Sequence, residues 1–217
     1  GTTSIKRLGN SITVPLILTI ITVIIAIVSG TNPLIAIVGY GIVLFAGYVA
    51  LYEIYRGARA RHESIGEGWL RAITALFQRN QRRYGGYIVH LGVTIIGIGI
   101  IGSTVFQTEG QYTLRRGEQV SIYDYSVQFD NFTRAQAVDG RMMNISEVTL
   151  YRNNNEIAQL RPRIDDYPDM PMTIAGAHST LENDFYVLYL GGDSERATFR
   201  IYINPLINLV WWGGIIL

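Results

Sequence analysis

Residues 87–106 read YIVHLGVTIIGIGIIGSTVF, and they decide the fold because they contain no Asp, Glu, Lys or Arg. The hydrocarbon core of a bilayer is roughly 30 Å thick, and a helix needs about 20 apolar residues to cross it. Backbone N–H and C=O groups in lipid must be paired within the segment, as they are in an α-helix. Residues 87–106 are therefore predicted to form a transmembrane helix.

The same reasoning applies upstream, where residues 12–28 and 34–52 are also free of charged side chains. Two transmembrane helices are predicted within residues 1–56. Residues 205–217 open another apolar run, which is too short to cross a bilayer, and they are predicted to start a truncated transmembrane helix. Because the sequence also begins without Met, we expect it to be an excerpt of a longer, polytopic membrane protein.

Charge predicts the orientation of these segments. Lys6 and Arg7 precede the first apolar block, and residues 56–86 contain seven Arg against two Glu. Residues 107–204 contain nine Arg against fourteen Asp or Glu, a balance of 9 − 14 = −5. Since short cytoplasmic loops carry an excess of Lys and Arg, residues 57–86 are predicted to be a cytoplasmic loop and residues 107–204 to be extracytoplasmic.

Within the predicted cytoplasmic loop, apolar side chains recur at helical spacing in Trp69, Ile73, Leu76 and Phe77. Arginines lie on the other sides of the same predicted helix. This pattern is typical of an amphipathic helix in the membrane interface, close to anionic lipid head groups. The lipid bilayer is therefore the expected partner of this basic segment, and no nucleic acid is expected.

The segment 107–204 has a different pattern, in which short runs alternate apolar and polar residues. Alternation with β-branched and aromatic residues predicts strands with one buried face at 120–123, 125–129, 145–151 and 197–203. Turn residues separate them at Asp139-Gly140, Asn153-Asn154-Asn155 and Gly191-Gly192-Asp193-Ser194. We therefore expect an inserted antiparallel β domain, a small barrel or a sandwich. Since the chain contains no cysteine, the domain has no disulfide.

Catalytic motifs do not emerge from the sequence, and no residue is assigned a catalytic role. Asp165, Asp166 and Asp169 form the one acidic cluster that suggests Ca²⁺, but they lack the spacing and the glycine of an EF-hand loop. The flanking Pro168 and Pro171 favour a turn instead.

His90 is the candidate binding residue, because ionisable groups inside a span are costly and usually functional. Gly86, Thr94 and Gly97 fall close to the same helix face. In one interpretation this face packs against another helix and His90 is hydrogen-bonded to a neighbouring span. In the other, the imidazole is an axial ligand of haem iron. The residues alone favour packing.

A haem site with two histidine ligands would need a second intramembrane histidine. The other two histidines of this sequence, His62 and His178, fall in the predicted cytoplasmic loop and in the predicted outer domain. The second ligand would therefore lie outside this sequence.

Three stretches resemble the CcmF-type cytochrome c haem lyases. RRYGGYIVHLG at 82–92 is similar to the family's approach to a late span, and NPLINLVWWGG at 204–214 to the start of the following span. MPMTIAGAHST at 170–180, with DFYV at 184–187, looks like a threonine-rich turn and the strand after it. Trp211 and Trp212 fit an aromatic belt at a membrane interface.

The resemblance implies a subunit of the cytochrome c maturation machinery in the bacterial inner membrane. Such proteins receive haem from a haem chaperone and, with other maturation subunits, promote its covalent attachment to apocytochrome c. They also hold haem b between two histidines on different spans, and His90 matches one of these positions, which makes haem ligation the favoured interpretation. Whether this chain acts as an enzyme stays open. The alternative is a non-enzymatic assembly or transport component whose outer β domain docks a partner.

Overall fold

The structure, a computed structural model, describes residues 5–217, and their side chains from residue 11 onward. The first four residues of the predicted segment 1–56, and the side chains of Lys6 and Arg7, lie outside the described residues. The chain divides into two compact units, one helical and one formed by Gln107–Pro205.

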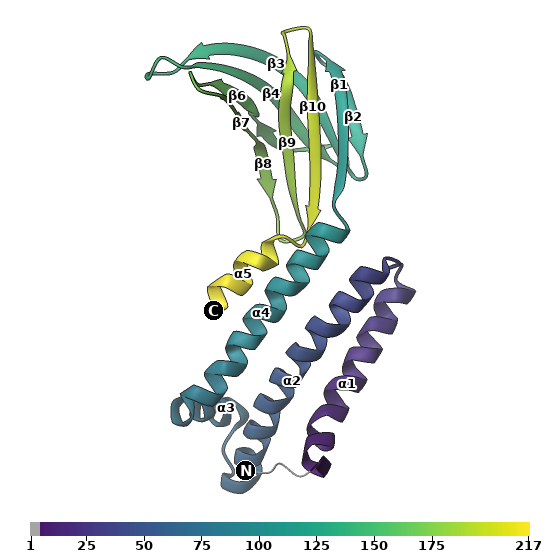
Figure 1. Ribbon diagram of the computed structural model, residues 1–217, viewed down its shortest axis with the longest axis vertical. Coiled ribbons are helices and arrows are strands. Elements are labelled where there is room, and N and C mark those ends of the chain that lie inside the picture. Colours follow the sequence, from purple (N-terminus) through teal and green to yellow (C-terminus); the bar gives the residue numbers. More distant parts are fainter. Residues whose placement is uncertain (1–4) are drawn as a thin grey trace. The chain divides into compact units, whose positions relative to one another are not determined.

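The helical unit comprises five helices, α1 to α5 (Figure 1). Three of them, α1, α2 and α4, are long and apolar enough to cross a membrane. In the unit, α1 packs on α2, α2 on α4, and α4 on α5. The prediction of a polytopic helical membrane protein is confirmed. The helices span Ile5–Val28 (α1), Leu34–Ile65 (α2), Trp69–Arg79 (α3), Gln81–Val105 (α4) and Asn208–Ile216 (α5).

The helices run further than the uncharged blocks from which they were predicted. Helix α2 continues to Ile65 and ends at Gly66, whose φ of 73° is the left-handed conformation that glycine adopts at helix ends. Helix α4 begins at Gln81. Within residues 57–86, predicted as a cytoplasmic loop with an amphipathic helix, the structure has the end of α2, all of α3 and the start of α4.

Helix α3 packs on both of its neighbours. Ala72 and Leu76 are buried with Ala58 of α2 and Tyr84 of α4. The side of α3 on which the sequence places Leu76, expected to meet lipid, therefore contacts protein. Leu70, at 81% exposure, projects away from this contact.

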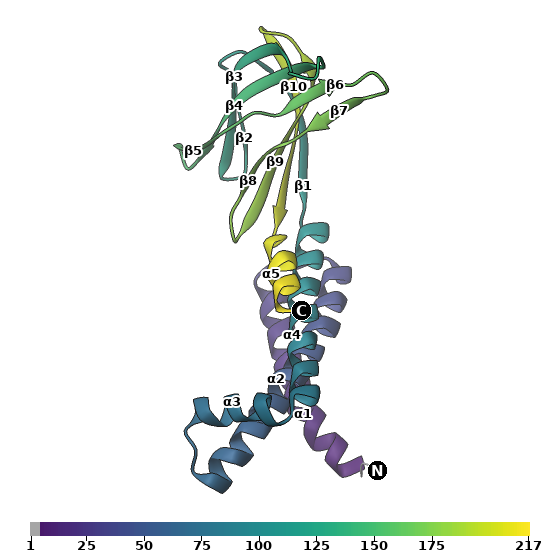
Figure 2. The same cartoon turned by 90° about the vertical axis from the view of Figure 1, so that its left-hand side faces the viewer.

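The β unit consists of two antiparallel sheets (Figure 2). The first has the strand order β1-β10-β9-β8, and the second has the order β2-β3-β4-β6-β7, with β5 also paired to β4. The strands are Thr108–Arg115 (β1), Gln119–Ile122 (β2), Tyr125–Gln136 (β3), Met142–Arg152 (β4), Asn155–Leu160 (β5), Arg163–Asp166 (β6), Pro171–Ile174 (β7), Gly176–Ser179 (β8), Asn183–Gly192 (β9) and Arg196–Pro205 (β10).

Aromatic side chains from the two sheets meet in one core. The ring centroids of Tyr125 and Phe185 lie 5.2 Å apart, and those of Phe129 and Phe199 lie 5.5 Å apart. Phe129 and Phe199 have no exposed surface. Along β10 every second residue from Ala197 is buried, which is the alternation that the sequence showed. The prediction of an antiparallel β domain is confirmed, and of the two predicted architectures the structure has the sandwich.

The first and last strands bring the two ends of the β unit together. Strand β1 pairs with β10 in a register that sets Thr108 opposite Ile203. Just before β1, Gln107 Nε2 donates a hydrogen bond of 2.6 Å to Asn204 Oδ1. The unit therefore starts and ends at neighbouring positions, as a domain inserted between two spans requires.

Candidate functional site

His90 lies on α4 in the uncharged stretch that predicted a span. Its side chain is exposed. Among the residues whose side chains the structure describes, none forms a hydrogen bond or an ion pair with the His90 ring. The exposed imidazole is thus a polar group on an apolar helix, and it has no partner among these residues.

The predicted polar stripe on α4 divides into two parts. Thr94 and Gly97 pack on α2, where a Cβ added to Gly47 would lie 2.7 Å from Thr94 Cγ2. A Cβ added to Gly97 would lie 2.9 Å from Val43 Cγ2. Thr94 is buried, and its Oγ1 donates a 2.8 Å hydrogen bond to the His90 carbonyl oxygen. This part of the stripe serves helix packing, as small residues do between membrane helices.

The N-terminal part of the stripe is open. Gly86, one turn before His90, is exposed, and a Cβ added to it would meet no atom within 4 Å. Gly85 is similarly open. A flat group bound at His90 could therefore approach the α4 backbone over Gly86. The residues present fit an axial haem ligand with one protein donor from this chain.

An apolar cavity of about 730 Å³ lies between α2 and α4. Its α4 wall begins at Ile88 and Leu91, which lie on another side of the helix from His90. Thr94, which lies close to the same helix face as His90, also lines this cavity. The cavity is lined by Leu44, Gly47, Tyr48, Leu51, Ile88, Leu91, Thr94, Ile95, Ile98 and Ile216.

A polar cluster joins α2 to α4 one turn before His90. The Glu53 carboxylate accepts hydrogen bonds from Arg56 at 2.8 Å and Arg83 at 3.0 Å, and from the Tyr87 hydroxyl at 3.5 Å. Together with the Thr94 contact, this cluster sets the rotation of α4 about its axis. It thereby determines the direction in which His90 projects.

The other two histidines are placed elsewhere. His62 lies in the last turn of α2, where its Nδ1 is 2.5 Å from the Glu67 carbonyl oxygen and its ring stacks on Trp69 at 4.9 Å. His178 lies on β8, opposite Phe185. In residues 5–217 no three His, Cys, Asp or Glu side chains gather in a group that could hold a metal ion.

The acidic cluster near residue 165 is a structural ion pair. Asp165 is fully buried, and it accepts hydrogen bonds from Arg141 at 3.1 Å and Arg163 at 2.9 Å. Asp166 ends β6, and the two prolines flank the turn into β7. Two arginines therefore neutralise the carboxylate of Asp165, which was one of the three candidate Ca²⁺ ligands.

The sequence did not reveal a second packing face on α4. Gly92, Gly99 and Gly102 face the segment 206–217. A Cβ added to Gly213 of α5 would lie only 2.6 Å from the Gly92 carbonyl oxygen. The glycines at 92, 99 and 102 follow a helical spacing that could have indicated this contact.

These features define a class of protein, a helical membrane protein with an antiparallel β-sandwich inserted after a span. Residues 105–205 match the family model described as the CcmF C-terminal beta-sandwich. The solved structure of a cytochrome c heme lyase CcmF has the same fold, with a TM-score of 0.75 and 19% identity over the whole chain and 33% of that protein.

Curated relatives extend the similarity beyond the β unit. The chain is 24% identical to the cytochrome c-type biogenesis protein CcmF of Pseudomonas aeruginosa, covering 73% of this chain and 23% of that protein. It is 27% identical to the cytochrome c-type biogenesis protein CycK of Rhizobium meliloti, covering 86% of this chain and 27% of that protein. The chain is thus similar to CcmF-type proteins, and it spans about a quarter of the length of the curated relatives that it matches.

Proposed function

We propose that this chain takes part in cytochrome c maturation in the bacterial inner membrane, in the transfer of haem and its covalent attachment to apocytochrome c. The β-sandwich match and the names of the relatives support this role. The proposed partners are a haem chaperone, apocytochrome c and other maturation subunits. In the proposed topology, residues 57–86 are cytoplasmic, with α3 close to the membrane interface, and residues 107–204 are extracytoplasmic.

We propose further that His90 is an axial ligand to the iron of haem b. The observation that carries this proposal is the exposed ring on an uncharged span, beside the open backbone at Gly86. The ring has no partner among residues 11–217, whose side chains the structure describes. A polar group facing hydrocarbon is costly unless it is paired. Coordination of iron by one ring nitrogen would satisfy it, and bound haem would supply a redox-active iron.

The residues around His90 hold the helix and leave the ring free to bind. Thr94, packed on Gly47, uses its hydroxyl on the backbone of α4, so that it does not compete for the imidazole. The Glu53 cluster also fixes α4 against α2, nearer the N-terminus of α4. His90 therefore projects in a defined direction from the exposed surface of α4.

The test is His90→Ala in the full-length protein, with His62→Ala as the matched control. We expect His90→Ala to lose the haem absorbance of the purified protein while membrane insertion is retained, because removal of a polar group does not oppose burial in lipid. His90→Met should retain haem with a raised reduction potential, because Met ligation raises it. His62→Ala should keep the spectrum. Unchanged haem content in His90→Ala would show that His90 is a packing residue.

A further inference from the structure

Strand β7 is the outer strand of its sheet. On one side β7 is paired with β6, and on the other side no strand of residues 5–217 is paired with it. The β6–β7 hairpin stands at the margin of the β unit (Figure 2). An outer strand presents backbone N–H and C=O groups that can pair with another chain.

The side chains along this margin are apolar and exposed. Met170 is 68% exposed and Met172 is 54% exposed, with Tyr167 beside them at 39%. Residues 170–174 contain no charged side chain, although charges are a common protection of strand edges. We name Tyr167, Met170, Pro171, Met172 and Thr173 the β7 edge surface. Methionine side chains are flexible and polarisable, so that they adapt to different apolar partners.

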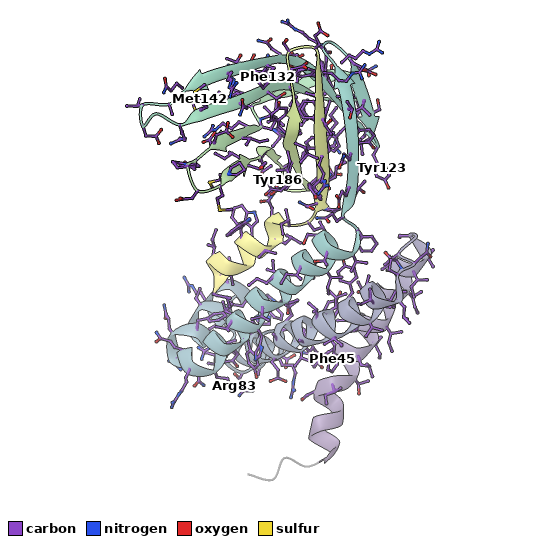
Figure 3. All side chains as sticks on the ribbon, turned by 45° about the horizontal axis from the view of Figure 1, so that its top comes forward. Phe45, Arg83, Tyr123, Phe132, Met142 and Tyr186 are labelled. Atoms are coloured by element: carbon purple, nitrogen blue, oxygen red, sulfur yellow. The ribbon has the colours of Figure 1, made fainter. Side chains whose placement is uncertain are left out.

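A cavity with acidic side chains, here named the acidic hollow, lies next to the β7 edge surface. The turns at the tips of the β3–β4 and β6–β7 hairpins border a cavity of about 450 Å³. Met142 lies at the hairpin end of β4, next to this cavity (Figure 3). The cavity is lined by Asp139, Gly140, Arg141, Met142, Asp166, Tyr167 and Pro168.

The charge of this region is negative. Residues 139–141 and 163–170 contain two Arg and four Asp, a balance of 2 − 4 = −2. Arg141 is engaged with Asp139 and Asp165, and its guanidinium lies 5.1 Å from the centre of the Tyr167 ring. Asp166 accepts a hydrogen bond of 2.9 Å from the neutral amide of Asn144. Asp166 and the exposed Asp169 therefore keep their negative charge available to a partner.

We propose that the β7 edge surface binds an extended polypeptide segment of a partner protein, which adds a strand to β7. Backbone hydrogen bonds to β7 would supply affinity, and alternate side chains would supply specificity. Apolar side chains of the segment would lie on Met170 and Met172, and a Lys or Arg would enter the acidic hollow. In the sequence of the partner segment, basic and apolar residues therefore alternate. This proposal is independent of haem ligation by His90.

The test uses the full-length protein in lipid nanodiscs and fluorescent heptapeptides, with binding measured by anisotropy. The first peptide alternates Lys and Val, the second alternates Glu and Val, and the third is the Lys–Val peptide N-methylated at every backbone nitrogen. We expect the Lys–Val peptide to bind at least about tenfold more tightly than the other two, because only it offers both positive charge and backbone donors.

Met172→Lys should weaken binding of the Lys–Val peptide by at least about tenfold, because a lysine on an edge strand opposes both pairing and a cationic partner. Leu181→Lys is the matched control, since Leu181 is 72% exposed and lies outside the β7 edge surface. Asp166→Asn with Asp169→Asn should reduce the preference for Lys over Glu. All three variants should keep the haem spectrum, whereas His90→Ala should keep peptide binding.

Equal binding of the Lys–Val and Glu–Val peptides would overturn the proposed charge preference. Unchanged binding in Met172→Lys, equal losses in Met172→Lys and Leu181→Lys, or no binding of the Lys–Val peptide would overturn the docking surface itself. None of these results bears on His90, whose test is the haem spectrum.

Discussion

Gly213 and Gly214 are neighbours in α5 with opposite surroundings. A Cβ at Gly213 would meet the backbone of α4 at Gly92 and Ile96, whereas a Cβ at Gly214 would meet no atom within 4 Å. Close backbone contact between membrane helices requires small residues at the contact. The two positions therefore form a natural pair for measuring how much this contact contributes to stability.

We expect Gly213→Ala to destabilise the protein by about 1–3 kcal/mol, the usual cost of forcing an extra methyl group into a packed contact. Gly214→Ala should be neutral or slightly stabilising, because Ala favours helix over Gly by roughly 1 kcal/mol. Thermal unfolding in detergent, compared between the two variants, provides the measurement. Equal melting temperatures would show that α5 does not pack on α4 through Gly213.

Asp193 stabilises the turn between β9 and β10. Its Oδ1 accepts hydrogen bonds from the backbone N–H groups of Glu195 at 2.8 Å and Arg196 at 3.0 Å. These two backbone bonds lower the pKa of the Asp193 carboxyl below its ordinary value. The carboxylate thus contributes stability above the unfolded pKa of about 3.9.

That contribution is lost as the pH falls through the lower folded pKa. We expect Asp193→Asn to be less stable than wild type at pH 6, with the difference shrinking below pH 4. Denaturant unfolding of both proteins across this range provides the measurement. A stability difference independent of pH would show that the Asp193 charge has no part in holding the turn.

At the scale of elements, the β4–β5 hairpin depends on two residues with positive φ. Asn153 has a φ of 50° and Asn154 a φ of 65°, the conformation of a tight hairpin turn. A β-branched residue is strained there, since the left-handed region costs an L-residue roughly 1–2 kcal/mol. We expect Asn154→Val to lose about that amount. Asn155→Val, one residue into β5, should cost less than half as much when measured by chemical unfolding.

The strands that the sequence predicted are those in which apolar and polar residues alternate regularly. The alternation in 125–129 and 197–203 predicted β3 and β10, because each second side chain enters the core. Strands β1, β5, β6, β7 and β8 were not among the strands predicted from alternation; β6 and β7 combine four residues with burial that does not alternate, so that they show no period. The three shortest of these are held by pairing, β6 with β4, β7 with β6 and β8 with β9.

The candidate site was predictable only in part. The uncharged span made His90 visible, and the Gly86-to-Gly97 spacing located one face of α4. The sequence could not show that Thr94 and Gly97 contact α2 while His90 does not share in this packing, because that division depends on the helix crossing. The sequence also did not predict the burial of α3. That burial involves Ala58 and Ala72, and an alanine in a sequence does not indicate which face of a helix is buried.

At the scale of the whole molecule, the proposed topology predicts opposite accessibility for two exposed residues. Ser64 lies near the end of α2, and Asn154 lies in the β4–β5 turn. The excess of arginine in 56–86 assigns Ser64 to the cytoplasm. In spheroplasts, a membrane-impermeant maleimide should therefore label Asn154→Cys, and label Ser64→Cys only after lysis. The reverse pattern would invert the topology.

The pairing of β1 with β10 has a consequence for the order of folding. Thr108 and Ile203 are direct partners, although 203 − 108 = 95 residues separate them in the sequence. Contacts between distant residues form slowly, and a strand that waits for its partner is exposed to wrong pairing. In the strand order, β1 has β10 as its one neighbour, so that it emerges from the ribosome about a hundred residues before its partner. The earliest-made strand of the sandwich is therefore the one that stays open to wrong pairing until the last strand is made.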